Sequence, residues 1–264
     1  MRPVEVMACV WMVAAAVLGG CARQHVRSHE PSDLSASPTA SSWHTIGHST
    51  QGRDIEAATI GRGSVRVLIV GSIHGNETEA LAVMDDLRRH MLVFAADRAT
   101  VRLIRDINPD GTRLGRRTNA RGVDLNRNWP AFNFAPAPSR GLEPGSEVET
   151  RLLLHELRGF GAHATLVCHS IPRGPFVNFD GPAEGLAAAF ATAAARSDPR
   201  WRVEPTMGYA TPGSLGSFVG VDRSEPILTI EFARGHEPGM AREALLAGTL
   251  AVIEALESAE RNGR

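Results

Sequence analysis

Apolar residues along the chain follow two alternating patterns. Short runs of β-branched and aliphatic residues predict buried strands over 65–70, 101–107, 164–168 and 227–232. Helices are predicted over 77–90, where apolar residues recur at helical spacing, and over 146–159, 183–196 and 238–261. Strands that alternate with helices are typical of an α/β domain, so we expect a mixed, largely parallel sheet sandwiched by helices.

Three local signals mark boundaries between these elements. The sequence Asn108-Pro109-Asp110-Gly111 is a strong turn signal at the end of the second strand. Ser146 and Glu149 have the spacing of a capping box and predict the start of a helix. The Pro- and Gly-rich stretch 130–145 predicts a long loop beside the functional site.

The N-terminus has the features of an export signal. Arg2 precedes an apolar run over residues 6–18, which is shorter than the roughly 20 residues that a membrane-spanning helix needs. Leu-Gly-Gly before Cys21 resembles a bacterial lipoprotein signal, in which the cysteine is lipidated. We therefore expect a signal peptide over 1–20, a flexible tether over 21–42 and a folded domain over 43–264, lipid-anchored in the cell envelope.

Composition limits the classes of function. The chain has 264 residues, is 43% hydrophobic and has a formal net charge of −1, which suits one ordinary globular α/β domain. No basic excess is present, so we expect a protein that binds no nucleic acid. A monomer is expected as well. Of the cysteines, only Cys168 lies in the expected domain, which therefore cannot form an internal disulfide.

Polar residues gather where the predicted strands end. His74 follows the first strand, Asn108 the second and His169 the third, while Glu231 ends the last. In open α/β sheets, ligands bind beyond the carboxyl ends of the strands. These residues are therefore the candidates for a functional site.

A metal site is the first interpretation of these residues. His74 and Glu77 are three residues apart, so both side chains can reach one ion from the same side of a turn. Zinc binds imidazole nitrogen and carboxylate oxygen, and a catalytic site takes a third protein ligand. His169 is the best candidate, with neighbouring Cys168 as the alternative; only one of the two can face the ion, because successive strand residues point to opposite faces.

Glu231 lies in the otherwise apolar strand Ile-Leu-Thr-Ile-Glu-Phe, where a carboxylate is costly unless it is paired or functional. A base beside a metal-activated water is one interpretation, and a buried ion pair with arginine is the other. The arginines over 113–127 alternate with Gly, Asn and Pro rather than following a helical period, and suggest a substrate with a free carboxylate. Tyr209 opens a Gly- and Ser-rich loop and either approaches the ligand or anchors that loop.

Together these motifs resemble the zinc carboxypeptidase family. From about Ser49 to Glu231 the chain shows, in order, His-x-x-Glu after a strand, Asn-Pro-Asp-Gly, Arg-Thr-Asn, Asp-Leu-Asn-Arg-Asn, a strand-end His-Ser, a loop with Tyr and a strand-end Glu. The resemblance implies a mixed eight-stranded sheet between helices. It also implies that His74, Glu77 and His169 bind one zinc ion, and that Glu231 activates water and passes its proton to the leaving amine.

The same resemblance implies roles for the residues that hold the substrate. Arg117 would polarise the scissile carbonyl and stabilise the tetrahedral oxyanion, with Arg116 as a close competitor. Asn126 and Arg127 would hold the terminal carboxylate of a peptide substrate, and Tyr209 would close over it.

Within the family, the segments Gly-Val-Asp-Leu-Asn-Arg-Asn-Trp-Pro over 122–130 and Tyr-Ala-Thr-Pro-Gly-Ser-Leu-Gly-Ser over 209–217 look most like the murein peptide amidase branch. That resemblance implies hydrolysis of the amide between γ-D-glutamate and meso-diaminopimelate in murein peptides. An export signal departs from the best-known amidases of this branch, which act inside the cell. The alternatives are a general metallocarboxypeptidase, a deacylase of N-acyl amino acids and a catalytically silent peptidoglycan-binding lipoprotein.

Overall fold

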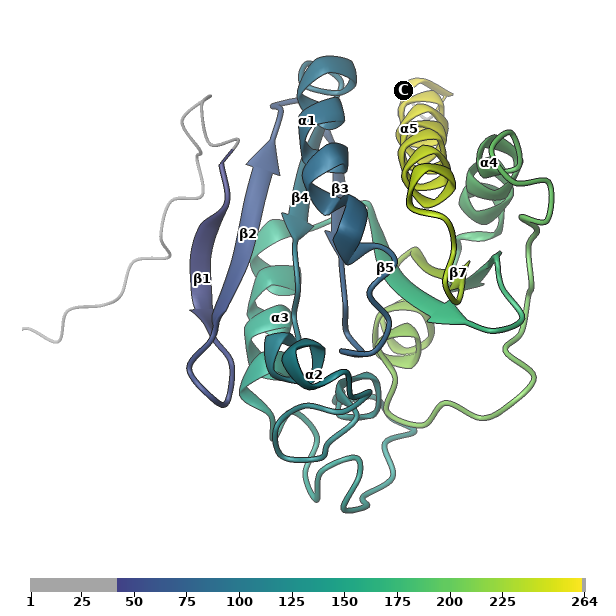
Figure 1. The fold of residues 1–264 in the computed structure, drawn as a ribbon. Coiled ribbons are helices and arrows are strands. Elements are labelled where there is room, and N and C mark those ends of the chain that lie inside the picture. Colours follow the sequence, from purple (N-terminus) through teal and green to yellow (C-terminus); the bar gives the residue numbers. More distant parts are fainter. Residues whose placement is uncertain (1–41, 263–264) are drawn as a thin grey trace, which may run out of the picture. The chain divides into compact units, whose positions relative to one another are not determined.

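The computed structural model describes residues 42–262, which form a twisted seven-stranded sheet flanked by helices (Figure 1). The expected signal peptide, the tether and the lipidated Cys21 lie outside the described residues and stay predictions. In chain order the strands are β1 (His44–His48), β2 (Asp54–Ile60), β3 (Val65–Val70), β4 (Ala99–Ile104), β5 (Ala164–Ile171), β6 (Phe176–Asp180) and β7 (Ile227–Ala233).

The sheet is mixed, with a parallel centre and antiparallel margins. Its order is β1-β2-β4-β3-β5-β7-β6, in which β4, β3, β5 and β7 run parallel. β2 is antiparallel to β4, β1 to β2, and β6 to β7. The predicted fold class is confirmed, but the described residues contain seven strands and not eight. At the outer edge of β6, Val203 makes only an isolated bridge with Val177, which is too short to form another strand.

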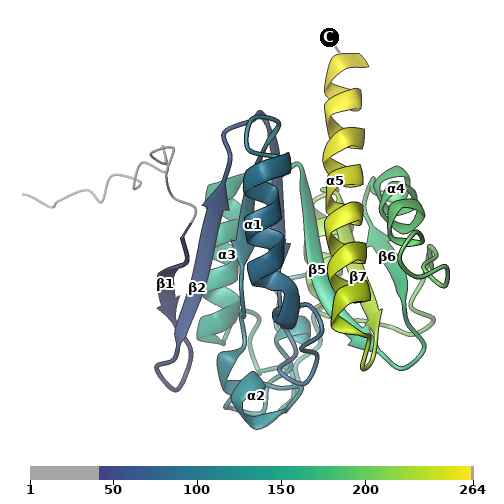
Figure 2. The ribbon, with the colours of Figure 1, turned by 45° about the horizontal axis from the view of Figure 1, so that its top comes forward.

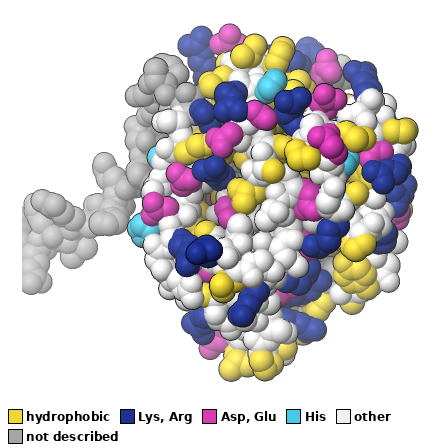
Figure 3. Space-filling model, viewed as in Figure 1, with side chains coloured by type: hydrophobic (Ala, Val, Ile, Leu, Met, Phe, Trp, Pro, Cys, Tyr) yellow, Lys and Arg dark blue, Asp and Glu magenta, His cyan; other side chains and the backbone are white. Residues whose placement is uncertain are grey.

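The described residues contain five α-helices, namely α1 (Met84–Phe94), α2 (Pro109–Leu114), α3 (Val148–Phe160), α4 (Glu184–Ala194) and α5 (Pro238–Asn262). Helices α1, α4 and α5 pack on one face and α3 on the other (Figure 2). The two faces follow from strand alternation. In β3, Val67 and Ile69 join the first core, whereas Leu68 and Val70 join the second. Among the described residues, no helix is both long enough and apolar enough to cross a membrane. Basic and acidic side chains are interspersed on the face of the molecule shown in Figure 3.

The four predicted strands and four predicted long helices are present, but some boundaries differ. The first predicted helix starts late: residues 77–80 are not helical, Leu81–Val83 form a 3₁₀ turn, and α1 begins at Met84. The prediction of a turn over Asn108–Gly111 is wrong, because this segment begins helix α2. Pro109 lies in the first turn of the helix, and the Asn108 side chain accepts a hydrogen bond from the Gly111 N–H. This is a favourable helix start, since proline there lacks only an N–H that the helix does not use.

The prediction of a capping box formed by Ser146 and Glu149 at the start of α3 is also wrong. Glu147 is the N-cap residue of α3 and makes no capping hydrogen bond through its side chain. Ser146 Oγ donates to the Glu147 carboxylate at 2.8 Å, and Glu149 Oε1 accepts from the Thr50 N–H at 2.9 Å. Glu149 is fully buried, so its carboxylate serves tertiary packing instead of reaching back to its own helix.

Candidate active site

The site forms at the carboxyl ends of the parallel strands. Strand β5 carries His169, which lies directly opposite Glu231 on the neighbouring strand β7, so both side chains leave the sheet on the same side. His74 and Glu77 lie in the turns that follow β3, the other parallel neighbour of β5. Residues 95 positions apart in the chain are thereby brought into contact.

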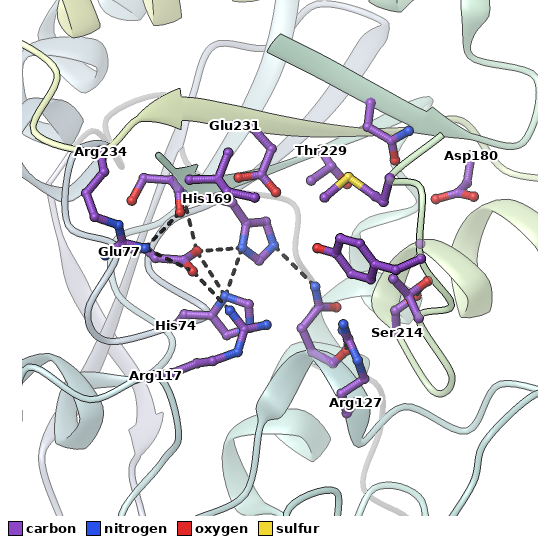
Figure 4. A pocket seen from close by; sticks show the side chains of 18 residues that line it. His74, Glu77, Arg117, Arg127, His169, Asp180, Ser214, Thr229, Glu231 and Arg234 are labelled. Atoms are coloured by element: carbon purple, nitrogen blue, oxygen red, sulfur yellow. Dashed lines mark hydrogen bonds and ion pairs between the residues drawn. The ribbon is translucent and has the colours of Figure 1, made fainter. Parts of the chain in front are cut away.

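Three side chains converge as a metal-ligand set (Figure 4). Glu77 Oε2 lies 2.9 Å from His74 Nδ1 and 2.8 Å from His169 Nδ1, and the two imidazole nitrogens are 3.0 Å apart. All three residues are buried. Two imidazole nitrogens and one carboxylate oxygen that face a common point are the donor set of a catalytic zinc site with an open position. The residues therefore fit the metal that the sequence predicts.

Cys168 is excluded as a ligand by the alternation of β5. Its side chain lies in the hydrophobic core on the opposite face from His169, and it is 1% exposed. Burial raises the pKa of this thiol to about 12, so the thiolate that a metal binds is disfavoured. His169 is therefore the third ligand candidate, as the sequence predicts.

The charges around the ligand set keep Glu77 anionic. Burial would raise the pKa of Glu77, but hydrogen bonds with His169 and His74 outweigh it and hold that pKa well below its usual range. Burial would likewise lower the pKa of His74, yet its interactions with Asp124 and Glu77 raise it. An anionic carboxylate between two imidazoles is ready to receive a cation.

Asp124 supports the ligand set from behind. Its Oδ1 lies 3.0 Å from His74 Nε2, the ring nitrogen that faces away from the other ligands, and its Oδ2 accepts a hydrogen bond from Arg117 Nε at 2.9 Å. A carboxylate in this position fixes the orientation and tautomer of a metal-binding histidine. This role was not predicted from the sequence, although Asp124 opens the Asp-Leu-Asn-Arg-Asn motif.

Glu231 is a buried carboxylate that forms no salt bridge within the described part of the chain. It is 5% exposed, lines the same pocket as the ligand set, and has no arginine within salt-bridge distance among the residues that the structure describes. Burial raises its pKa and outweighs the opposing charge of His169, while the nearby Glu77 carboxylate adds to the rise. The described residues therefore do not contain the alternative, a buried ion pair between Glu231 and an arginine. A carboxylate with a raised pKa is a better proton acceptor than an ordinary surface Glu.

The predicted arginines separate in space. Arg117 lines the pocket and donates from Nη1 to Glu77 Oε1 at 3.1 Å, whereas Arg116 is exposed and is not part of the pocket wall. Of the two competing candidates, only Arg117 is placed to meet a substrate carbonyl. The loop over 130–145, predicted to lie beside the site, contributes no residue to the pocket wall.

Asn126, Arg127 and Tyr209 form another wall of the pocket. Asn126 Nδ2 lies 3.3 Å from His169 Nε2, and Asn126 Oδ1 accepts from the Leu215 N–H at 2.9 Å, which ties this wall to the ligand set. Arg127 Nη1 donates to the Asn126 carbonyl at 2.6 Å, and Tyr209 is 54% exposed. The structure thus brings together all of the predicted site residues in the described chain except Arg116.

Two further charged residues of the pocket have no counterpart in the sequence analysis. Asp180 ends β6 on the side of the pocket that also holds Ser214 and Thr229, and Arg234 lies beside Glu77 on the other side (Figure 4). Arg234 follows Glu231 by three residues, which was an available signal. No sequence signal marked Asp180, because it ends an antiparallel strand that was not predicted.

The fold and the site define an α/β zinc metallopeptidase, and the family model described as zinc carboxypeptidase matches residues 32–186, which include the three metal-ligand candidates. The chain belongs to the zinc carboxypeptidase family. Murein peptide amidase A of Escherichia coli (strain K12) is 32% identical, in an alignment that covers 62% of this chain and 70% of that protein. Murein peptide amidase A of Vibrio campbellii is 28% identical over 63% of this chain and 68% of that protein.

Solved structures agree on the fold. The murein-tripeptide amidase of Escherichia coli O157 superposes with a TM-score of 0.61 at 24% identity, covering 83% of this chain and 94% of that one. The carboxypeptidase A of Helicoverpa armigera superposes with a TM-score of 0.64 at 17% identity, covering 82% of this chain and 69% of that one.

Proposed function

We propose that this metallopeptidase hydrolyses the amide bond between γ-D-glutamate and meso-diaminopimelate in murein peptides. The observation that carries the proposal is the distribution of charge in the pocket. The Asn126 and Arg127 side chains, which suit a substrate carboxylate, lie in one pocket with the metal-ligand set and with Asp180. Asp180 forms no salt bridge within residues 42–262. The similarity to murein peptide amidase A supports the same substrate.

The roles of the residues follow from their positions. When bound by His74, Glu77 and His169, zinc supplies a Lewis acid that acidifies water and polarises a carbonyl. Glu231 accepts a proton from the attacking water and returns it to the leaving amine. Arg117, at the rim of the pocket, stabilises the negative charge that develops on the carbonyl oxygen.

Substrate orientation comes from the wall opposite Glu77. Arg127 presents a guanidinium fork that fits a carboxylate, and Asn126 offers an amide beside it. Tyr209, which is exposed at the same pocket, would close over the bound carboxylate. Burial lowers the pKa of Arg127, yet a guanidinium remains charged throughout the physiological range. A free carboxylate on the amine side of the scissile bond is therefore a requirement of this pocket.

Asp180 narrows the choice of the amine-side residue. Its carboxylate forms no salt bridge among residues 42–262, and burial raises its pKa, so it gains from a cation in the pocket. Gly216 leaves room beside it, since a Cβ at that position would lie 2.3 Å from Asp180 Oδ2. Diaminopimelate carries a side-chain ammonium that would complete this pair, whereas an aliphatic or aromatic residue carries none.

The test compares three peptides on purified, zinc-loaded protein. These are L-Ala-γ-D-Glu-meso-diaminopimelate, the same peptide with L-2-aminopimelate, which lacks the distal ammonium, and an α-linked L-peptide ending in lysine. We expect the Asp180→Asn variant to raise KM for the diaminopimelate peptide by about 10- to 100-fold, since a charged hydrogen bond is lost. For the aminopimelate peptide, wild type and the Asp180→Asn variant should have the same KM.

Asp97→Asn is the matched control, because Asp97 is exposed and lies outside the pocket. Equal losses on all peptides would contradict the role of Asp180. Faster hydrolysis of the α-linked peptide would favour the second candidate, a general metallocarboxypeptidase, which the Asn126–Arg127 corner would serve equally well.

The proposal extends to the location of the enzyme. The signal-like residues 1–20 and Cys21 would anchor the chain by lipid in the cell envelope, beside murein. Cells fed a labelled fatty acid are expected to label the wild-type chain and not the Cys21→Ala chain. Label on both, or on neither, would contradict the anchor.

A further inference from the structure

Arg234 is a charged side chain of the pocket that the proposed reaction leaves without a task. It follows the end of β7 and lines the pocket, and its side chain is 40% exposed. Nη1 donates to the Asn76 carbonyl at 2.8 Å, and Nη2 donates to the Ser170 carbonyl at 3.0 Å. Two main-chain carbonyls, one in the turn after β3 and one near the end of β5, thus hold the guanidinium in place.

The charge of Arg234 is only weakly compensated. Its closest carboxylate oxygen is Glu77 Oε1 at 3.8 Å, which already accepts a hydrogen bond from Arg117 at 3.1 Å. Glu77 Oε2, the other oxygen, faces the two histidines. Main-chain carbonyls orient a guanidinium without neutralising it, so N–H donors and charge remain available to an anion in the pocket.

The position of Arg234 distinguishes it from the Asn126–Arg127 corner. The His169 ring has two edges: Nδ1 faces Glu77, which lies near Arg234, and Nε2 faces Asn126, which lies next to Arg127. Figure 4 shows Arg234 and Arg127 on opposite sides of His169. A peptide whose terminal carboxylate lies at Arg127 and whose scissile carbonyl lies at the ligand set extends its acyl side toward Arg234.

We propose that Arg234 binds a carboxylate on the acyl side of the scissile bond, namely the free α-carboxylate of a γ-linked D-glutamyl residue. This inference rests on the proposed function. In a γ-linked amide the side-chain carbonyl is cut, and the α-carboxylate stays free nearby. An α-linked peptide has a neutral amide at the corresponding place. Arg234 is thereby a specificity residue that selects γ-linked over α-linked substrates.

The test is a cycle of two enzymes and two substrates. The substrates are L-Ala-γ-D-Glu-meso-diaminopimelate and its analogue in which the α-carboxylate of D-glutamate is a carboxamide. Wild type is expected to show a KM about 10- to 100-fold lower for the carboxylate than for the carboxamide, the size of effect expected for a charged hydrogen bond. Arg234→Gln is expected to remove that difference, with kcat retained within a few-fold, and Arg234→Lys to restore part of it.

Arg202→Gln is the matched control. Arg202 also donates to a main-chain carbonyl, that of Pro175 at 3.0 Å, and its side chain is 45% exposed, but it lies outside the pocket. The Arg202→Gln variant is expected to show the same KM difference between the carboxylate and carboxamide substrates as wild type. Zinc content and circular dichroism of each variant report the integrity of the fold.

Different failures have different meanings. If wild type does not distinguish the two substrates, or if Arg234→Gln lowers kcat/KM equally for both, Arg234 only braces the turn at Asn76 against β5 at Ser170, and the inference is overturned. If wild-type, zinc-loaded protein cuts neither γ-linked peptide, the proposed function fails and the inference falls with it.

Discussion

Glu231→Gln is expected to lower kcat by about 10² to 10⁴-fold while the protein keeps its zinc and its fold. The substitution removes the proton acceptor but preserves the volume and polarity of the buried side chain. Since Glu231 forms no ion pair in the described structure, no partner is left unpaired by the change. The measurement is steady-state hydrolysis of the murein tripeptide, with zinc content determined on the same samples.

Glu56→Gln is the control for this experiment. Glu56 is also a strand residue, but it is half-exposed and pairs with Arg105 outside the pocket. It should leave kcat within a few-fold of wild type. A Glu231→Gln variant with nearly full kcat would contradict the assignment of Glu231 as the base.

His169→Ala is expected to abolish both zinc binding and hydrolysis. Loss of a carboxylate that only supports a ligand costs about 10- to 100-fold in metal affinity, and loss of the ligand itself must cost more. His169 contacts both other members of the set, with Nδ1 within 3.0 Å of His74 Nδ1 and 2.8 Å of Glu77 Oε2. Its removal therefore leaves two ligands where a zinc ion takes three from the protein.

Zinc per chain, measured after dialysis, reports this prediction directly. His155→Ala, at an exposed position of α3, is the matched control and should retain zinc. His169→Gln keeps a polar side chain in the buried site, in case the alanine variant does not fold. Retention of one zinc per chain by a folded His169 variant would show that the ligand set has been assigned incorrectly.

The parallel centre of the sheet was predictable because its strands are buried on both faces. Strands of this kind appear in the sequence as nearly continuous apolar runs, as in Val-Arg-Val-Leu-Ile-Val of β3. The antiparallel strands β1, β2 and β6 were missed. β1 is largely exposed and polar, β2 contains alanines that favour strands weakly, and β6 is short and ends at Asp180.

The site residues that could be predicted are those whose residue type is unusual for the end of an apolar strand. His74, Glu77, His169 and Glu231 stand out because polar groups at the ends of apolar strands are costly without a function. Asp124 and Arg234 were missed because their roles depend on distance in space. Asp124 is 50 residues from His74, and Arg234 binds the carbonyl of Asn76, 158 residues away.

The most direct test of the central claim is a mass-spectrometric time course of L-Ala-γ-D-Glu-meso-diaminopimelate with the zinc-loaded protein. We expect two products, free diaminopimelate and the dipeptide L-Ala-D-Glu, and no products after chelation of the metal. Readdition of zinc should restore both. An intact tripeptide in the presence of folded protein with bound zinc would contradict the proposed function.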